Sequence, residues 1–268
     1  MKALRNRPIG IFDSGVGGLT VARSVHKRLP HEDIIYFGDT ARVPYGNKSR
    51  ATIKRFSRQI IDFMMGKKVK MIIVACNTAS SLALPSLKDD YAVPVIGVIA
   101  PGIREAVRLS GNGRIGVIGT GATISSGSYE RELKRIDKTC RLFSKSCPLF
   151  VPLVENRFTS DPVTYQVAER YLKGLRGKPI DTLILGCTHY PVLKTVIGKV
   201  MNNVRLVDSS SAVAGEVAET LLRKELEVRG KKRRGELTCF VSDDVKGFRK
   251  TAEIFMKKKK IRVKKVVL

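Results

Sequence analysis

The sequence contains no tryptophan, and aromatic residues make up only 6% of its 268 residues. It has 24 acidic residues against 50 lysines and arginines, so its formal net charge is +26. No apolar run reaches the roughly 18 residues that a membrane-spanning helix needs. The first apolar stretch ends at Asp13, which is too early for a signal peptide. We therefore expect a soluble, cytoplasmic protein without a membrane partner.

Cysteine occurs five times, but not in a pattern typical of disulfide-rich or zinc-binding proteins. An odd number of widely spaced cysteines does not indicate a disulfide framework. No two of them have the two-residue spacing of a zinc knuckle or a redox motif. We therefore expect no metal site. The five are Cys76, Cys140, Cys147, Cys187 and Cys239.

The excess of positive charge raises the hypothesis of a nucleic-acid partner. Residues 221–268 hold 17 basic and 6 acidic residues, with basic runs at 231–234 and 257–260. Such runs are usually solvated faces or interaction tails. No zinc-finger spacing and no aromatic-rich strand of an RNA-recognition fold accompanies them. We expect no dedicated nucleic-acid site, although the charge is compatible with non-specific binding to polyanions.

Strand-like apolar runs alternate with helix-like segments along the chain, which predicts an α/β protein with mostly parallel sheets. The length suits one large domain or two small ones. Helices are expected near 19–29, 49–65, 212–226 and 246–255. Strands are expected at 8–12, 33–37, 71–75, 95–99, 114–118, 149–152, 182–185, 205–207, 237–242 and 261–267.

Two segments of the chain are echoed later in it. Residues 9–15 align with 115–121, and residues 72–78 align with 183–189. The same order and nearly the same offset indicate two related halves. We expect two similar lobes in a pseudo-twofold relation, each a mostly parallel sheet flanked by helices, with the active site in the cleft between them. The first lobe would be 1–98 plus 209–268, and the second 99–208.

Ligands of open α/β sheets bind beyond the carboxyl ends of the strands, where both echoed segments end in polar residues. Cys76 and Cys187 each follow a predicted strand. A thiol has a reference pKa of about 8.5 and can exchange a proton near neutral pH. Two thiols facing one stereocentre could therefore racemise it, one removing the α-proton and the other returning a proton. The alternative is that each cysteine is a small buried apolar residue. The glycine-rich turn at 13–18 could equally bind an anion.

Four segments, 9–20, 36–49, 75–80 and 185–191, resemble the signature segments of the glutamate racemases, cofactor-independent members of the aspartate/glutamate racemase group. The resemblance implies two-base interconversion of L- and D-glutamate without a cofactor or metal, supplying D-glutamate for peptidoglycan synthesis. We expect a homodimer. By resemblance, Cys76 and Cys187 are the catalytic thiols, and Asp13, Glu155 and His189 assist proton transfer. The substrate-binding residues would be Asp13, Ser14, Tyr45, Gly46, Asn77, Thr78, Thr188 and His189.

Two alternatives stay open at this point. An aspartate-specific racemase of the same superfamily would handle a substrate one methylene shorter, a difference worth only about 1–3 kcal/mol of discrimination. The motifs at 44–46 and 187–191 favour glutamate. A polyanion-binding protein on a racemase-like scaffold is suggested by the charge alone.

Overall fold

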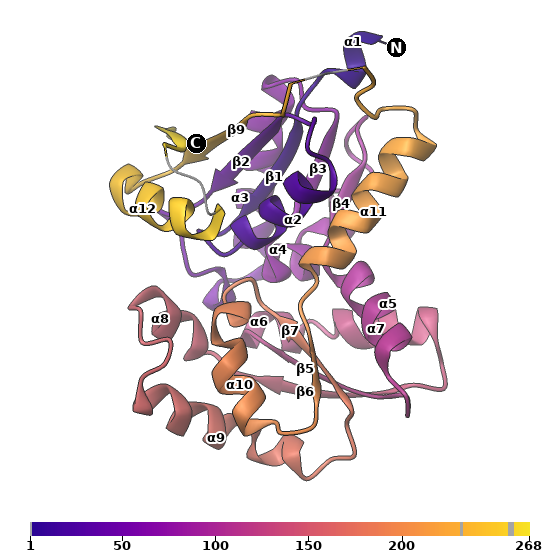
Figure 1. Ribbon diagram of the computed structural model, residues 1–268, viewed down its shortest axis with the longest axis vertical. Helices are drawn as coiled ribbons and strands as arrows, with labels where there is room; N and C mark the ends of the chain where they lie inside the picture. Colours follow the sequence, from indigo (N-terminus) through magenta and orange to yellow (C-terminus); the bar gives the residue numbers. More distant parts are fainter. Residues whose placement is uncertain (1, 231–232, 257–259) are drawn as a thin grey trace. The chain divides into compact units, whose positions relative to one another are not determined.

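The chain divides into two compact units in a computed structural model that describes residues 2–230, 233–256 and 260–268 (Figure 1). Unit 1 combines Met1–Val98 with Ser210–Leu268, and unit 2 is Ile99–Ser209. The chain therefore leaves unit 1 once and later returns to it. Residues 231–232 and 257–259, which belong to the two basic runs, lie outside the described residues.

Unit 1 contains a six-stranded sheet in the order β10-β9-β2-β1-β3-β4, with every neighbouring pair parallel. Parallel strands buried on both faces are continuously apolar rather than alternating, which explains runs such as Ile-Gly-Ile-Phe in β1. The strands are β1 (Ile9–Asp13), β2 (Ile34–Gly38), β3 (Met71–Val74), β4 (Val95–Gly97), β9 (Leu237–Val241) and β10 (Arg262–Lys265).

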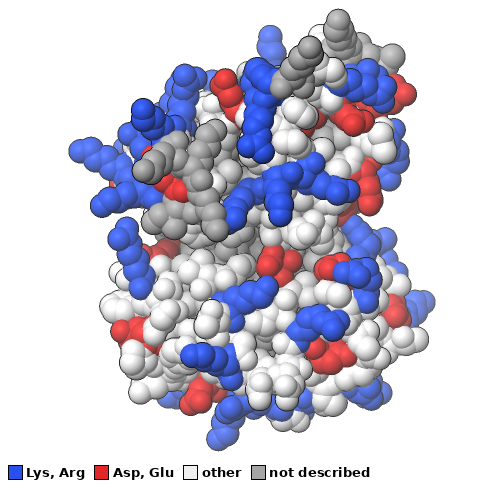
Figure 2. Space-filling model, in the orientation of Figure 1, with Lys and Arg blue, Asp and Glu red and all other residues white. Residues whose placement is uncertain are grey.

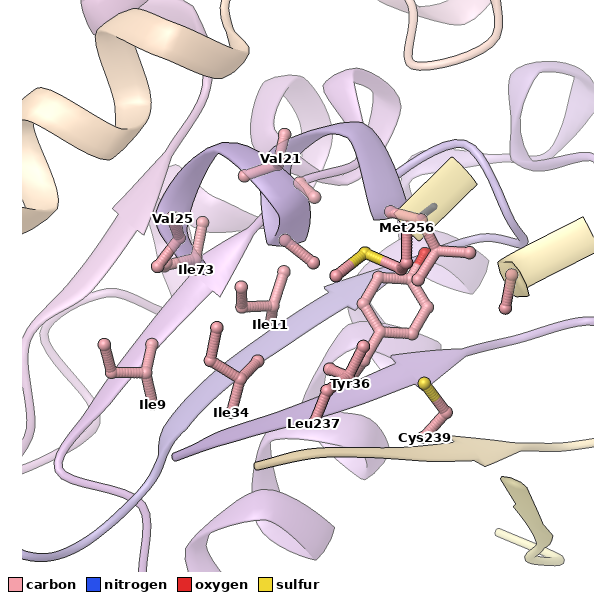
Figure 3. Packing of buried hydrophobic residues seen from close by; sticks show 14 of the residues in the cluster. Ile9, Ile11, Val21, Val25, Ile34, Tyr36, Ile73, Leu237, Cys239 and Met256 are labelled. Atoms are coloured by element: carbon pink, nitrogen blue, oxygen red, sulfur yellow. The ribbon is translucent and has the colours of Figure 1, made fainter. Parts of the chain in front are cut away.

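Helices cover both faces of this sheet. On one face, α2 (Leu19–Arg28), α11 (Ser210–Arg223) and α12 (Val245–Met256) enclose an apolar cluster with the strands (Figure 3). On the other face, Phe63 of α3 (Arg50–Gly66) packs 5.2 Å from the ring of Phe240. The shorter elements are α1 (Lys2–Arg5), η1 (Tyr45–Asn47), α4 (Asn77–Leu82) and η2 (Leu84–Ser86).

Unit 2 contains a four-stranded parallel sheet in the order β6-β5-β7-β8. Side chains of α5 and α7 pack on one face of it, and those of α8, α9 and α10 pack on the other. The strands are β5 (Arg114–Gly119), β6 (Arg141–Ser146), β7 (Thr182–Gly186) and β8 (Arg205–Val207). The helices are α5 (Ile99–Leu109), α6 (Gly121–Ser125), α7 (Ser128–Ile136), α8 (Phe150–Glu155), α9 (Pro162–Arg176), η3 (Tyr190–Leu193) and α10 (Lys194–Val200).

The echo in the sequence corresponds to equivalent strands. The order β2-β1-β3-β4 in unit 1 matches β6-β5-β7-β8 in unit 2. The register matches as well, because Gly10 lies opposite Ile72 and Gly116 opposite Leu183. A Cβ on either glycine would lie within 2.9 Å of a side-chain atom, so both strands are closely packed at this position. The predicted α/β fold with two parallel sheets is confirmed.

One predicted strand was wrong. Residues 150–152 belong to α8 and Leu149 is its N-cap, and the strand at this position in the sheet is β6, Arg141–Ser146. β6 lies at a sheet edge and is half exposed, so it carries too few apolar residues to stand out. Phe150 and Val151 are apolar because they are buried on one side of a helix. Pro152 is tolerated there because the first turn of a helix needs no N–H donor.

Positive charge is distributed over both units. Unit 1 carries 33 basic and 15 acidic residues, and unit 2 carries 17 and 9. Figure 2 shows Lys and Arg side chains spread over the visible face, with a group on the left where Figure 1 places α12. Among the described residues, no helix is long and apolar enough to cross a membrane.

A buried ion pair joins distant segments of unit 1. Lys70 and Glu32 are both buried, and the Lys70 Nζ lies 2.5 Å from Glu32 Oε2. The same ammonium donates to the carbonyls of Arg5 (2.6 Å) and Leu226 (2.7 Å), and Glu32 accepts from the N–H of Val228. The pair therefore links the amino-terminal segment to the segment that follows α11.

We expect Lys70→Met to lower the free energy of unfolding by about 3–5 kcal/mol, because it leaves the Glu32 carboxylate buried without its cation. Urea denaturation of the whole protein, followed by circular dichroism, measures the change. The double variant Lys70→Met/Glu32→Leu should recover a large part of the loss. Equal stability of the single variant and the wild type would contradict this account.

Candidate active site

The carboxyl ends of β1 and β3 bring Asp13 and Cys76 to the same edge of the unit 1 sheet. The two strands pair in parallel, and the Ala75 N–H donates to the Phe12 carbonyl at 2.8 Å, extending the pairing by one residue. Asp13 is fully buried and Cys76 is 4% exposed. The Gly15 N–H donates to Asp13 Oδ2 at 3.0 Å, which holds the carboxylate in the turn after β1.

The glycine-rich turn after β1 serves close packing. A Cβ on Gly18 would lie 2.5 Å from the Asp13 Cβ and 2.9 Å from the Tyr36 hydroxyl oxygen. Only glycine therefore lets α2 start this near to Asp13. The Tyr36 hydroxyl, on β2, donates to the Gly15 carbonyl at 2.8 Å and holds the turn against the sheet. Ser14, within this turn, is buried.

Asn77 and Thr78 begin α4 directly after Cys76, and both are buried. The next turn is held by Ser80, whose hydroxyl donates to the Val74 carbonyl at 2.8 Å and whose N–H donates to the Cys76 carbonyl at 2.9 Å. These bonds fix the direction in which the chain leaves β3, and with it the position of the Cys76 thiol.

Tyr45 and Gly46 begin the short helix η1 in the loop after β2. The Tyr45 side chain is 1% exposed and its hydroxyl donates to the Asp39 carboxylate, while Gly46 is half-buried. Burial, followed by the Asp39 charge, raises the pKa of Tyr45. The phenol is therefore neutral and directed inward, and the Tyr45–Gly46 segment can offer a ligand its backbone.

In unit 2, three predicted residues lie in a row. Cys187 follows β7 and is 7% exposed, and its Sγ lies 3.8 Å from His189 Nδ1. The other ring nitrogen, Nε2, lies 3.3 Å from Glu155 Oε1. A thiol, an imidazole and a carboxylate in this order can hold and exchange one proton. Thr188, between the first two along the chain, is buried.

Aromatic packing sets the distance between Glu155 and the Cys187 turn. Phe150, on the same helix as Glu155, lies edge-on to Tyr190 with ring centroids 5.2 Å apart. The Tyr190 N–H donates to the Cys187 carbonyl at 3.1 Å, and its hydroxyl donates to the Cys147 carbonyl at 2.8 Å. The packing of α8 on η3 therefore places the carboxylate beside the imidazole.

The structure adds residues that the sequence did not reveal. Burial, followed by the Asp13 charge, raises the pKa of Tyr36. Burial and the nearby Cys187 raise the pKa of Tyr129, whose hydroxyl lies 3.2 Å from the position of a Cβ on Gly186. A neutral buried phenol thus lies near Asp13 in unit 1, and another lies near Cys187 in unit 2. No motif predicts this, because Tyr36 lies on a strand and Tyr129 on a helix.

The predicted site residues therefore form two groups, one at the carboxyl edge of each sheet. All five cysteines are free, and the described residues contain no group of three or more His, Cys, Asp or Glu side chains suited to a metal ion. The unit 1 group is Asp13, Ser14, Tyr45, Gly46, Cys76, Asn77 and Thr78, and the unit 2 group is Glu155, Cys187, Thr188 and His189.

Comparison with known proteins identifies similar sequences and structures. The family model described as Asp/Glu/Hydantoin racemase matches residues 19–217. A glutamate racemase of Geobacter metallireducens is 49% identical over 251 residues, which cover 93% of each chain.

Solved structures agree with this similarity. A glutamate racemase isoform of Bacillus anthracis superposes with a TM-score of 0.94 at 37% identity, covering 98% of both chains. The Francisella tularensis glutamate racemase in complex with D-glutamate gives 0.91 at 40% identity, with the same coverage. An aspartate racemase of Picrophilus torridus gives 0.59 at 19% identity, covering 80% of this chain and 94% of that one, and shares the fold.

Two of the remaining cysteines should resist alkylation. Burial raises the pKa of the Cys147 and Cys239 thiols to about 12. Only the thiolate reacts, so at pH 8 these thiols should react with iodoacetamide on the order of 10³-fold more slowly than in urea-unfolded protein. The rate should rise with pH until about pH 12. Mass spectrometry of the labelled peptides measures it, and native labelling as fast as in urea would contradict the expectation.

Proposed function

The chain belongs to the Asp/Glu/Hydantoin racemase family and is an amino-acid racemase, and on that premise we propose that it interconverts L- and D-glutamate by two-base proton transfer. One observation carries the mechanism. Cys187 directly follows β7 and Cys76 lies two residues after the end of β3, and these strands occupy the same position in two sheets of the same order and register. The relatives named glutamate racemases, at 37–49% identity over nearly the whole chain, support the substrate.

In the proposed reaction, the Cys76 thiolate removes the α-proton of D-glutamate and the Cys187 thiol gives its proton to the opposite face of the carbon. The product is L-glutamate, and the two sulfurs have exchanged protonation states. The reverse reaction starts from Cys187. A thiol suits this step because its pKa lies near neutral pH when its surroundings stabilise the thiolate.

Neighbouring groups return each thiol to its starting state in this proposal. The imidazole of His189, 3.8 Å from the Cys187 sulfur and 3.3 Å from Glu155, is placed to accept or supply that proton. Asp13 would serve Cys76 from the same sheet edge. We propose that Ser14, the Tyr45–Gly46 segment, Asn77, Thr78 and Thr188, together with Asp13 and His189, bind the substrate through backbone amides and polar side chains.

The proposed product, D-glutamate, would supply peptidoglycan synthesis in the cytoplasm. The absence of a required cofactor and the homodimer also stay predictions, and each is open to direct measurement on the purified protein.

Incubation of the purified protein with L-glutamate in D₂O, without added cofactor, tests the reaction and its substrate. We expect D-glutamate that carries deuterium at the α-carbon, because the proton returned to the carbon comes from a thiol that exchanges with solvent. Chiral chromatography with mass spectrometry measures this. The parallel reaction with L-aspartate should be much slower. No conversion of glutamate, or faster conversion of aspartate, would refute the proposed substrate.

Removal of either thiol tests the two-base mechanism. We expect Cys76→Ala and Cys187→Ala each to lower kcat/KM by at least about 10²–10⁴-fold, the usual contribution of a positioned acid or base. The matched control is Cys140→Ala, a half-buried cysteine outside both groups, which should keep its activity. Circular dichroism shows whether each variant is folded. Wild-type racemisation by either active-site variant would rule out the mechanism.

A further inference from the structure

A buried carboxylate, Asp39, organises the loop that holds Tyr45 and Gly46. Asp39 is fully buried directly after β2, and its N–H donates to the Asp13 carbonyl at 3.1 Å. Its carboxylate accepts from the Arg42 Nε at 2.7 and 2.9 Å and from the Tyr45 hydroxyl. One residue thus connects the strand end that bears Asp13 to the proposed substrate-binding loop.

Arg42 neutralises this carboxylate and anchors the other side of the loop. Its Nη1 donates to Gln59 Oε1 on α3 at 2.6 Å, and its guanidinium lies 4.1 Å from the centre of the Phe56 ring. The Tyr45 ring lies 5.9 Å from the same phenylalanine. The loop is therefore held to α3 by a hydrogen bond from the Arg42 guanidinium and by contacts with the Phe56 ring.

The third support comes from a segment about 200 residues further along the chain. The Ser242 hydroxyl, just after β9, donates to Asp39 Oδ1 at 2.8 Å and accepts from the Ala41 N–H at 2.8 Å. The next residues repeat the link, because the Thr40 hydroxyl donates to the Asp243 carbonyl and accepts from the Asp243 N–H. The carboxy-terminal segment is thus bonded to the loop at both residues.

We propose that Ser242 and Asp39 are positioning residues for substrate binding, acting through Tyr45. Because the Tyr45 hydroxyl is bonded to Asp39, the segment can offer its backbone N–H groups to a substrate carboxylate. Their position depends on where Asp39 holds the ring, and Ser242 fixes one oxygen of Asp39. This inference rests on the proposed function and gives the basic carboxy-terminal segment a role in it.

The loss of the Ser242 hydroxyl changes the loop in a defined way. Ser242→Ala removes a donor to Asp39 Oδ1 and the acceptor of the Ala41 N–H. The Arg42 contact to the carboxylate remains, so its charge stays paired and the fold is retained. The carboxylate can then turn about its remaining contacts, and the Tyr45–Gly46 amides shift away from the substrate.

Steady-state racemisation in both directions tests the proposal. For Ser242→Ala we expect the KM of both enantiomers to rise about tenfold, equivalent to about 1.4 kcal/mol, with kcat changed by less than about threefold. Such a change indicates lost binding rather than lost proton transfer. Ser242→Thr, which keeps the hydroxyl, should restore the wild-type KM.

The matched control removes a side-chain contact of the neighbouring Asp243 and none of the backbone bonds to the loop. Lys265→Met removes an exposed ion pair to Asp243, whose atoms are 2.6 Å apart, and leaves Asp39 untouched, so its KM should equal that of the wild type. A second readout needs no turnover. The glutamate concentration that gives a fixed rise in Tm should increase about tenfold in Ser242→Ala, because a ligand stabilises the folded state by RT ln(1 + [L]/Kd).

The outcomes distinguish the positioning role of Ser242 from the proposed racemase activity. A wild-type protein that racemises no glutamate would overturn the proposed function, and the positioning roles with it. An active wild type with an unchanged KM in Ser242→Ala would overturn the positioning role alone. A lowered Tm with an unchanged KM would show that Ser242 serves stability only. A KM raised equally in Lys265→Met would overturn the positioning role, because the effect would then not depend on the bond between Ser242 and Asp39.

Discussion

Parallel pairing in one register is the constraint on which the rest of the structure depends. In parallel sheets the carboxyl ends of neighbouring strands meet at one edge, where ligands of α/β proteins bind. The pairing of β1 with β3 brings Asp13 beside Cys76, and the pairing of β5 with β7 places Cys187 at the equivalent position of the second sheet. A slip of one residue would turn each of these side chains to the other face.

The side chains near the two thiols differ between the two groups. Near Cys76 the partner is a carboxylate held by a backbone N–H in a glycine-rich turn. Near Cys187 it is an imidazole with a carboxylate behind it, placed by aromatic packing between α8 and η3. The echo in the backbone therefore does not extend to the side chains.

Packing requirements explain several residues that resemble ligand motifs. Gly18 resembles part of a phosphate-binding loop, yet its lack of a side chain lets α2 approach Asp13 and Tyr36. Tyr45 looks like a residue that contacts a ligand, yet its side chain is buried against Asp39 and Phe56. The basic carboxy-terminal segment looks like a tail for polyanions, yet Ser242 and Asp243 within it are bonded to the loop after β2.

The order of elements, the parallel sheets and the candidate cysteines were predictable from the sequence, because buried parallel strands are continuously apolar and the polar residues after them interrupt that pattern. The edge strand β6 was not predicted, because a half-exposed edge strand needs few apolar residues. The apolar residues Phe150 and Val151 were instead interpreted as part of a strand. The contacts by which Asp39, Arg42 and Ser242 hold Tyr45 could not be predicted from the sequence either. Tertiary structure decided these contacts, because hydrogen bonds between residues about 200 positions apart leave no local pattern, whereas strand burial does.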